Sequence, residues 1–238
     1  MDDSIVFSTA SRCFAPASRD EWRALTQGRS WQDFLDTARR LLQESAALGE
    51  EGVPADRVRF AAPLQDCLED GELDALFAPP SWDEKRSFDA RHFTGGLPAS
   101  APPIESLYRL PDGSYAASAP DDGSLPGSYD GEPARYMRAL IERMGFALPP
   151  AFSDRPDHLA LELDLLAIML DGGLVRQARC FLGERLAWLP AFRMRLVGMG
   201  DSPCARFYLG LVDVLLGVWL LHASEADAAG AAHRADVA

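Results

Sequence analysis

The chain has 238 residues, a formal net charge of −13 and a calculated isoelectric point of about 4.7. Nucleic-acid-binding proteins carry a basic face, so this acidity argues against that class. A hydrophobic share of 47% is ordinary for a soluble globular protein. An acidic surface speeds the approach of a positively charged peptide, although the same charge also serves solubility.

No targeting signal or disulfide framework is visible in the sequence. The N-terminus lacks a basic segment followed by an apolar run, so we expect no secretory signal. The pair Arg39-Arg40 resembles a twin-arginine export motif, but it lies in a helical pattern and acidic residues interrupt the segment after it. Four cysteines are scattered without a closely spaced pair, which favours a reducing cytoplasm: Cys13, Cys67, Cys180 and Cys204.

Apolar residues recur at helical spacing in the first 93 residues. Capping boxes at 18–21 and 81–84 each predict the start of a helix, because the first and fourth side chains satisfy each other's backbone N–H groups. Ser30 opens a longer helix between them, and a short helix is expected over 63–69. Residues 1–15 give only a weak helical signal. Lys85 is the only lysine beside many arginines, and we attribute this scarcity of lysine to genome composition.

Residues 95–131 break this pattern with many glycine, proline, serine and aspartate residues. A stretch of this length without regular structure is usually functional or mobile. It contains one apolar island, Pro-Pro-Ile-Glu-Ser-Leu-Tyr at 102–108. This island either packs on the helices as a strap or forms one wall of a groove.

Helical spacing returns after residue 131, and one of the helices is apolar on almost every side. That helix covers 159–170, and it belongs in the middle of a bundle because a surface helix keeps only one apolar stripe. We expect Asp154 to cap it, with Asp157 in its first turn beside solvent. The apolar run 207–221 is shorter than the roughly 20 residues of a membrane span and contains Asp213, so it predicts a core helix and no membrane insertion.

These patterns predict an all-α fold, a single globular bundle of about nine or ten helices. The bundle is expected to have two closely packed lobes, about 1–150 and about 151–222, joined at a hinge before residue 157. Residues 223–238, rich in alanine, aspartate and glycine, are expected to form a disordered tail.

No motif for catalysis, a cofactor or a metal is recognisable, so we predict no enzyme, no cofactor and no metal. Asp157 and His158 are the one polar pair of interest. Neighbouring residues on a helix diverge by about 100°, so the two side chains do not face one another. Glu162, four residues after His158, is placed to hydrogen-bond it. The pair is either a cap and hinge or a ligand-binding pair.

Four segments, in the right order on an all-helical pattern, resemble the TorD/DmsD (NarJ-like) family of molybdoenzyme maturation chaperones. Arg91-His92-Phe93 resembles the family's Arg-x-Phe segment, and 102–108 its Pro-Pro-aromatic-x-Ser-Val-aromatic strap. Residues 154–163 resemble its Glu-Pro-x-Asp-His…Glu-Leu hallmark, and 181–192 its Phe-Leu…Trp-x-Pro-x-Phe stretch. The chain departs from the pattern in a long loop over 109–131, and at two positions where the family often has an aromatic residue and a histidine: Ile104 and Arg185.

The resemblance implies a cytoplasmic chaperone that binds the twin-arginine signal peptide or the N-terminus of a molybdopterin-containing oxidoreductase subunit until its cofactor is inserted. Such a peptide presents two arginines and then an apolar stretch, so its receptor needs carboxylates beside an apolar groove. Asp157 and Glu105 are expected to accept the arginines. The full set of candidate peptide-binding residues is Asp157, His158, Tyr108, Leu107, Ser106, Glu105, Ile104, Leu159, Phe93 and Arg91.

Several alternatives remain open from the sequence. One is a NarJ-like assembly factor for a subunit that is not exported. Another is a nucleotide hydrolase, against which the missing phosphate-binding loop argues. A third is a metal-dependent helical regulator. The protein is expected to be a monomer or a homodimer.

Overall fold

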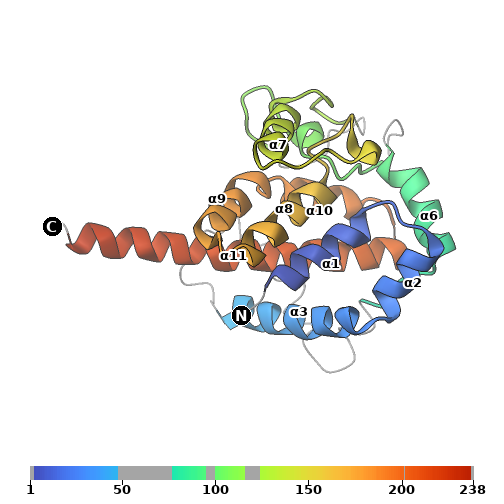
Figure 1. Ribbon diagram of the computed structural model, residues 1–238, viewed down its shortest axis with the longest axis horizontal. Helices are drawn as coiled ribbons and strands as arrows, with labels where there is room; N and C mark the ends of the chain where they lie inside the picture. Colours follow the sequence, from blue (N-terminus) through green and yellow to red (C-terminus); the bar gives the residue numbers. More distant parts are fainter. Residues whose placement is uncertain (1–2, 48–76, 95–99, 116–123, 201, 237–238) are drawn as a thin grey trace.

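The computed structural model describes residues 3–47, 77–94, 100–115, 124–200 and 202–236. Within these ranges the protein is built from nine α-helices and three short helices of other types, with two isolated β-bridges and no strand. The predicted all-α bundle of about nine helices is confirmed (Figure 1). The helix expected over 63–69 lies outside the described residues.

The α-helices follow one another along the chain with short connections in the second half. They are α1 (Ser4–Phe14), α2 (Arg19–Gln27), α3 (Arg29–Ala47), α6 (Trp82–Phe88), α7 (Glu132–Arg143), α8 (Leu159–Asp171), α9 (Val175–Arg185), α10 (Leu189–Val197) and α11 (Pro203–Asp236). The short helices are the π-helix η1 (Asp89–Phe93) and the 3₁₀-helices η2 (Glu105–Tyr108) and η3 (Pro150–Phe152).

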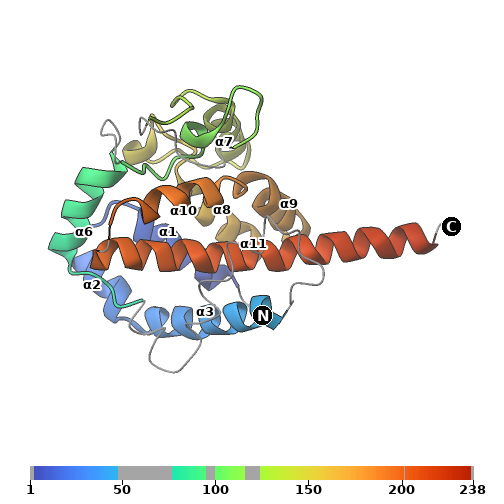
Figure 2. The ribbon, with the colours of Figure 1, turned by 180° about the vertical axis from the view of Figure 1, so that it is seen from behind.

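Helices α1 and α8 pack along each other at the centre of the bundle, and α11 packs on α3 and α10 (Figures 1 and 2). This confirms the prediction that α8, which is apolar on almost every side, lies in the middle of the bundle. The Ser11 hydroxyl of α1 donates to the carbonyl of Ala160 in α8, with 2.7 Å between the oxygens. Helix α1 gives a weak sequence signal because its buried face mixes apolar side chains with Ser4, Thr9 and Ser11.

Both predicted capping boxes are present, one at the start of α2 and one at the start of α6. Glu21 accepts the backbone N–H of Ser18 at 2.8 Å, and Glu84 accepts that of Ser81 at the same distance. Two indole N–H groups link the helix starts: that of Trp22 donates to Pro80 at 2.8 Å, and that of Trp82 to Ala17 at 2.9 Å.

Helix α11 was expected to end at His222, but it continues to Asp236 and projects beyond the other helices (Figures 1 and 2). Alanine, the strongest helix former, is the commonest residue of 223–236 and favours this continuation. Pro203–Leu221 is long and apolar enough to cross a membrane, but most of it is buried inside the protein. Its one acidic residue, Asp213, pairs with Arg193.

Candidate functional site

Residues 102–108, which we call the strap, lie against the turn that leads into α8. Sequence analysis assigned residues of the strap and the Asp157–His158 pair to one peptide-binding site, and the structure brings them together. A β-bridge and two backbone hydrogen bonds join them: Ile104 with His158, the Leu159 N–H with the Pro103 carbonyl at 2.8 Å, and the Glu105 N–H with the Asp157 carbonyl at 3.1 Å.

The Asp157 carboxylate points into the protein and not toward solvent. Its Oδ2 accepts the backbone N–H of Ser106 at 2.7 Å, and its Oδ1 is buried without a hydrogen-bond partner. The prediction that Asp154 caps α8 is wrong. His158 is the capping residue, because its Nδ1 accepts the Ala160 N–H at 3.2 Å. The helix therefore begins later than expected, and Asp157 precedes the cap.

Most of the candidate residues are too deeply buried to contact a peptide that approaches from solution. The carboxylates of Asp157 and Glu105, which were expected to accept arginines, have no solvent exposure. Nine of the ten candidates are at most 7% exposed: Asp157, His158, Tyr108, Leu107, Ser106, Glu105, Ile104, Leu159 and Phe93. Arg91 is exposed.

Three acidic side chains meet beneath the strap, namely Glu105, Asp157 and Glu162 of α8. The Glu105 and Glu162 carboxyl groups are close enough to shift each other's pKa, and Oε2 of Glu105 and Oε1 of Glu162 are both buried without a hydrogen-bond partner. A proton on either carboxyl supplies a donor for the other. Burial raises the pKa of Glu105 to about 7 and also raises the pKa of Asp157. Burial and then the neighbouring carboxyl of Glu105 raise the pKa of Glu162 well above its ordinary value. The pair therefore retains a proton at neutral pH.

The expected hydrogen bond between Glu162 and His158 is not formed. Glu162 instead accepts the indole N–H of Trp188 at 3.2 Å, while the acceptor nitrogen of His158 serves the helix cap. Because Trp188 also stacks on Tyr108 with 5.1 Å between ring centres, Glu162 supports the strap from below.

Arg185, near the end of α9, is the cation beside this acidic cluster. Its Nη1 lies 3.5 Å from Glu105 and 3.7 Å from Glu132 of α7. Its guanidinium also lies 4.4 Å from the centre of the Tyr136 ring. The residue that stands where the family often has a histidine thus connects α9, the strap and α7.

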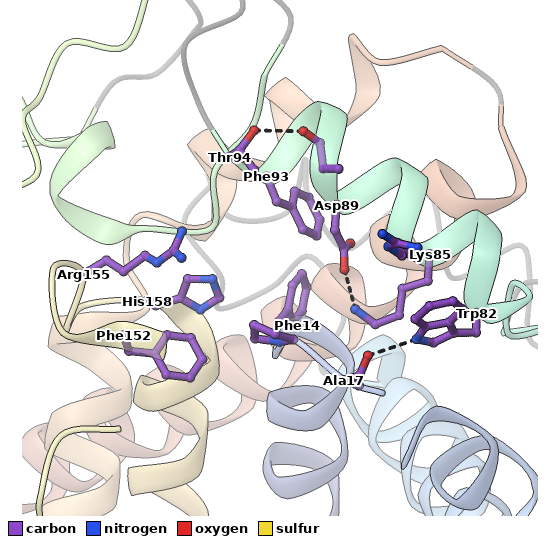
Figure 3. Close-up of a pocket in the computed structure, with 13 residues that line it drawn as sticks. Phe14, Ala17, Trp82, Lys85, Asp89, Phe93, Thr94, Phe152, Arg155 and His158 are labelled. Carbon is purple, nitrogen blue, oxygen red and sulfur yellow. Dashed lines mark hydrogen bonds and ion pairs between the residues drawn. The ribbon is translucent and has the colours of Figure 1, made fainter. Parts of the chain in front are cut away.

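A pocket of about 290 Å³ opens beside His158 (Figure 3). One wall carries Phe152, Arg155 and His158, and the opposite wall carries side chains of α6 and η1. Between them lie aromatic rings from α1 and η1. The aromatic lining residues are Phe14, Trp82, Phe93 and Phe152.

On the α6 side, an ion pair is set into the pocket wall. Nζ of Lys85 lies 2.5 Å from Oδ2 of Asp89, and Oδ1 of Asp89 accepts the Tyr208 hydroxyl at 2.9 Å. Asp89 is the only carboxylate among the described lining residues, and both of its oxygens are engaged. It lies at the start of the π-helix η1, a kind of irregularity often found at functional sites.

On the opposite side, His158 presents a neutral ring. Its Nδ1 accepts the Ala160 N–H, so the ring proton is on Nε2. Burial, followed by the positive charges of Arg155 and Lys85, lowers the pKa of His158 to about 3. His158 is therefore a neutral hydrogen-bond donor at physiological pH.

Two of the ten candidates, Phe93 and His158, line this pocket. Ser106 lines a second cavity of about 520 Å³ between the strap and the start of α7, and the other seven line neither cavity. Sequence reasoning missed Phe14, Phe152 and Lys85. The sequence could have indicated Lys85, because it is the only lysine and lies four residues before Asp89, the spacing of an ion pair on a helix.

Comparison with known proteins identifies the family. A family model described as the nitrate reductase delta subunit matches residues 72–194, just over half of the chain. The chain belongs to this family. The matched range contains all ten candidate residues. It also contains every described pocket residue except Phe14, Pro16 and Ala17. The resemblance to the TorD/DmsD (NarJ-like) maturation chaperones is confirmed.

Two curated relatives of this member of the nitrate reductase delta subunit family are both named "Chaperone protein TorD". The protein from Photobacterium profundum is 29% identical over 133 residues, which are 45% of this chain and 58% of the relative. The protein from Vibrio cholerae serotype O1 is 32% identical over 93 residues, which are 34% of this chain and 40% of the relative. The matches thus span less than two thirds of either relative. No solved structure matches the chain.

Proposed function

We propose that this protein is a cytoplasmic maturation chaperone that binds the twin-arginine signal peptide or the N-terminus of a molybdopterin oxidoreductase catalytic subunit. It would hold that segment until the cofactor is inserted, without catalysing a reaction itself. Membership of the nitrate reductase delta subunit family and the names of the relatives support this proposal. The observation that carries it is the open pocket with aromatic walls beside His158, within the family-matched region.

In this proposal the pocket, and not the Asp157 carboxylate, receives the client peptide. Grooves that bind peptides are lined by apolar and aromatic side chains with a few placed polar groups. Phe14, Phe93 and Phe152 supply the apolar surface. Asp157 acts indirectly, because it fixes the turn that carries His158. The net charge of −13 attracts the cationic peptide as a whole.

Calorimetric titration with synthetic N-terminal peptides of the source organism's molybdopterin oxidoreductases tests the proposal. We expect one peptide to bind one chaperone with a Kd near micromolar, about −8 kcal/mol, since a client has to be released. Ala90 is exposed and lines the pocket, so Ala90→Trp fills it without disturbing the core. This variant should lose at least tenfold in affinity at an unchanged unfolding temperature.

Ala139→Trp is the matched control, because Ala139 is exposed on α7 and does not line the pocket. It should bind as the wild type does. The proposal is contradicted if none of these peptides binds, or if Ala90→Trp binds as tightly as Ala139→Trp.

The family description favours a second candidate, an assembly factor that grips a subunit with no export signal. Purification of the native complex separates the two, since only an exported client carries the arginine pair. A nucleotide hydrolase would be indicated by GTP turnover that Asp157→Ala abolishes. In the described ranges no three His, Cys, Asp or Glu residues are grouped to hold a metal ion, and metal analysis of the purified protein tests a metal-dependent regulator.

A further inference from the structure

The pocket beside His158 has spare positive charge although the protein as a whole is strongly acidic. Arg86 lies with its guanidinium 5.4 Å from the centre of the Trp82 ring, on the exposed side of α6. Arg155 lies on the opposite wall. Its Nη2 donates to the Ala151 carbonyl at a long 3.4 Å, and its ion pair with Asp154 is long at 3.7 Å to a carboxylate that is 82% exposed. Both arginines therefore keep donors for a ligand.

The third donor is the neutral His158 ring, which carries its proton on Nε2 and lines the pocket. The one carboxylate in the lining, Asp89, is held by Lys85 and by the Tyr208 hydroxyl. The lining thus combines aromatic rings with unused donors, and it offers no free carboxylate among its described residues.

We infer that the pocket takes a large apolar side chain of the client peptide together with a carboxylate side chain directly beside it, and that it rejects the arginines. The inference rests on the proposed function and names the part of the client that enters. Arg86, Arg155 and His158 donate to the carboxylate. Phe14, Phe93 and Phe152 surround the apolar side chain. Charge-assisted hydrogen bonds of this kind are the stronger ones in proteins.

A guanidinium in the same place would meet three positive charges, and the one described lining carboxylate, Asp89, is already held by Lys85 and Tyr208. Lys85, Arg86 and Arg155 surround it, and displacing Lys85 from Asp89 would leave a buried ammonium without its partner. Such unpaired charges discriminate strongly between ligands. The arginines of a client therefore remain outside the pocket, where the acidic surface of the protein meets them.

Three synthetic peptides test this inference, identical except for one residue. Each has two adjacent arginines, then the test residue, then phenylalanine and an apolar tail, and the test residue is Asp, Asn or Lys. The net charge of −13 by itself favours the Lys peptide and disfavours the Asp peptide. The pocket predicts the reverse order, with the Asp peptide at least tenfold tighter than the Asn peptide and the Lys peptide weakest, measured by calorimetry at 0.15 M salt.

The double variant Arg86→Gln/Arg155→Gln tests whether the preference for the Asp peptide arises in the pocket. Its affinities for the Asp and Asn peptides should agree within about twofold, since Arg86 and Arg155 supply the charged donors. Arg176→Gln, an exposed position on α9 away from the pocket, is the matched control and should retain the preference. The inference is overturned if the Lys peptide binds as well as the Asp peptide, or if the preference survives in the double variant.

The proposed function is judged separately by the native N-terminal peptides. If those peptides bind while none of the three test peptides does, or while no preference for Asp appears, the inference fails and the chaperone function stands. If the native peptides also fail to bind, the proposed function itself fails, and with it the inference.

Discussion

The backbone N–H of Ser106 donates to Oδ2 of Asp157 at 2.7 Å, across 51 residues of sequence. Both residues are buried, so this hydrogen bond has no competition from water. It holds the strap on the turn before α8, and that turn carries Arg155 and His158 into the pocket. Asp157 is thereby a positioning residue, which differs from the direct arginine contact that the sequence predicted.

Asp157→Ala removes this acceptor and leaves the Ser106 N–H buried without a partner. We expect the free energy of unfolding to fall by about 1–3 kcal/mol, the usual cost of such a group. Urea unfolding monitored by tryptophan fluorescence measures the change. Asp154→Ala is the control, because the Asp154 side chain is 82% exposed, and it should change stability by less than about 0.5 kcal/mol. Equal effects of the two substitutions would contradict the role of the Asp157–Ser106 bond.

Glu162→Gln tests the proton shared by the buried carboxyls. Burial raises the pKa of Glu105 from 4.5 to about 7 and raises that of Glu162 well above 4.5, so the folded protein keeps a proton that the unfolded chain releases. The free energy of unfolding therefore falls as pH rises from about 4.5 through 7. In Glu162→Gln the amide donates permanently to Glu105, so this fall should be smaller between pH 5 and pH 8.

Chemical unfolding at several pH values measures the slope for wild type and variant. Glu142→Gln, at an exposed position on α7, is the control and should keep the slope of the wild type. A Glu162→Gln variant with the full wild-type slope would show that the buried pair does not share a proton.

His158→Asn tests the acid side of the stability profile. Burial and neighbouring cations lower the pKa of His158 from 6.5 to about 3, so the unfolded chain takes up a proton below pH 6.5 that the folded protein refuses. This group makes the free energy of unfolding fall as pH decreases from about 6.5 to 3. Asparagine is a good N-cap and does not titrate, so the variant should lose less stability between pH 7 and pH 4. Unfolding curves recorded between pH 7 and pH 4 measure this loss of stability. A loss in the variant equal to that of the wild type would contradict the prediction.

The fold was predictable where local chemistry and packing agree. The apolar residues of α8 require a buried position, and the two capping boxes are complete within four residues each. Helix α1 was underestimated because its polar residues Ser4, Thr9 and Ser11 are buried, and sequence spacing does not reveal tertiary contacts such as that of Ser11 with α8.

The site was predictable only in part, because its orientation depends on a single cap. The strap and the Asp157–His158 pair were correctly placed beside each other, yet whether Asp157 faces solvent depends on His158 replacing Asp154 as the N-cap. Aspartate is the commoner capping residue, so local propensity favoured the wrong register. Phe14 and Lys85 come from segments far from the strap, and only the packing of α1 and α6 brings them to His158.

A pair of identical substitutions tests how tightly the strap is held. A Cβ at Gly127 would lie 1.8 Å from the Ser106 carbonyl oxygen, and the Gly127 N–H donates to the Leu107 carbonyl at 3.0 Å. Gly127→Ala must therefore push the strap away, and we expect a loss of about 1–3 kcal/mol, the usual cost of overpacking. A Cβ at Gly183 within α9 meets nothing within 4 Å.

Gly183→Ala should raise stability by up to about 1 kcal/mol, because alanine is the better helix former. Scanning calorimetry should thus show melting temperatures that move in opposite directions for one and the same chemical change. Since Ser106 is also the residue that Asp157 holds, Gly127→Ala combined with Asp157→Ala should cost less than the sum of the two single changes. Additive losses would mean that the strap is not fixed as one unit between Gly127 and Asp157.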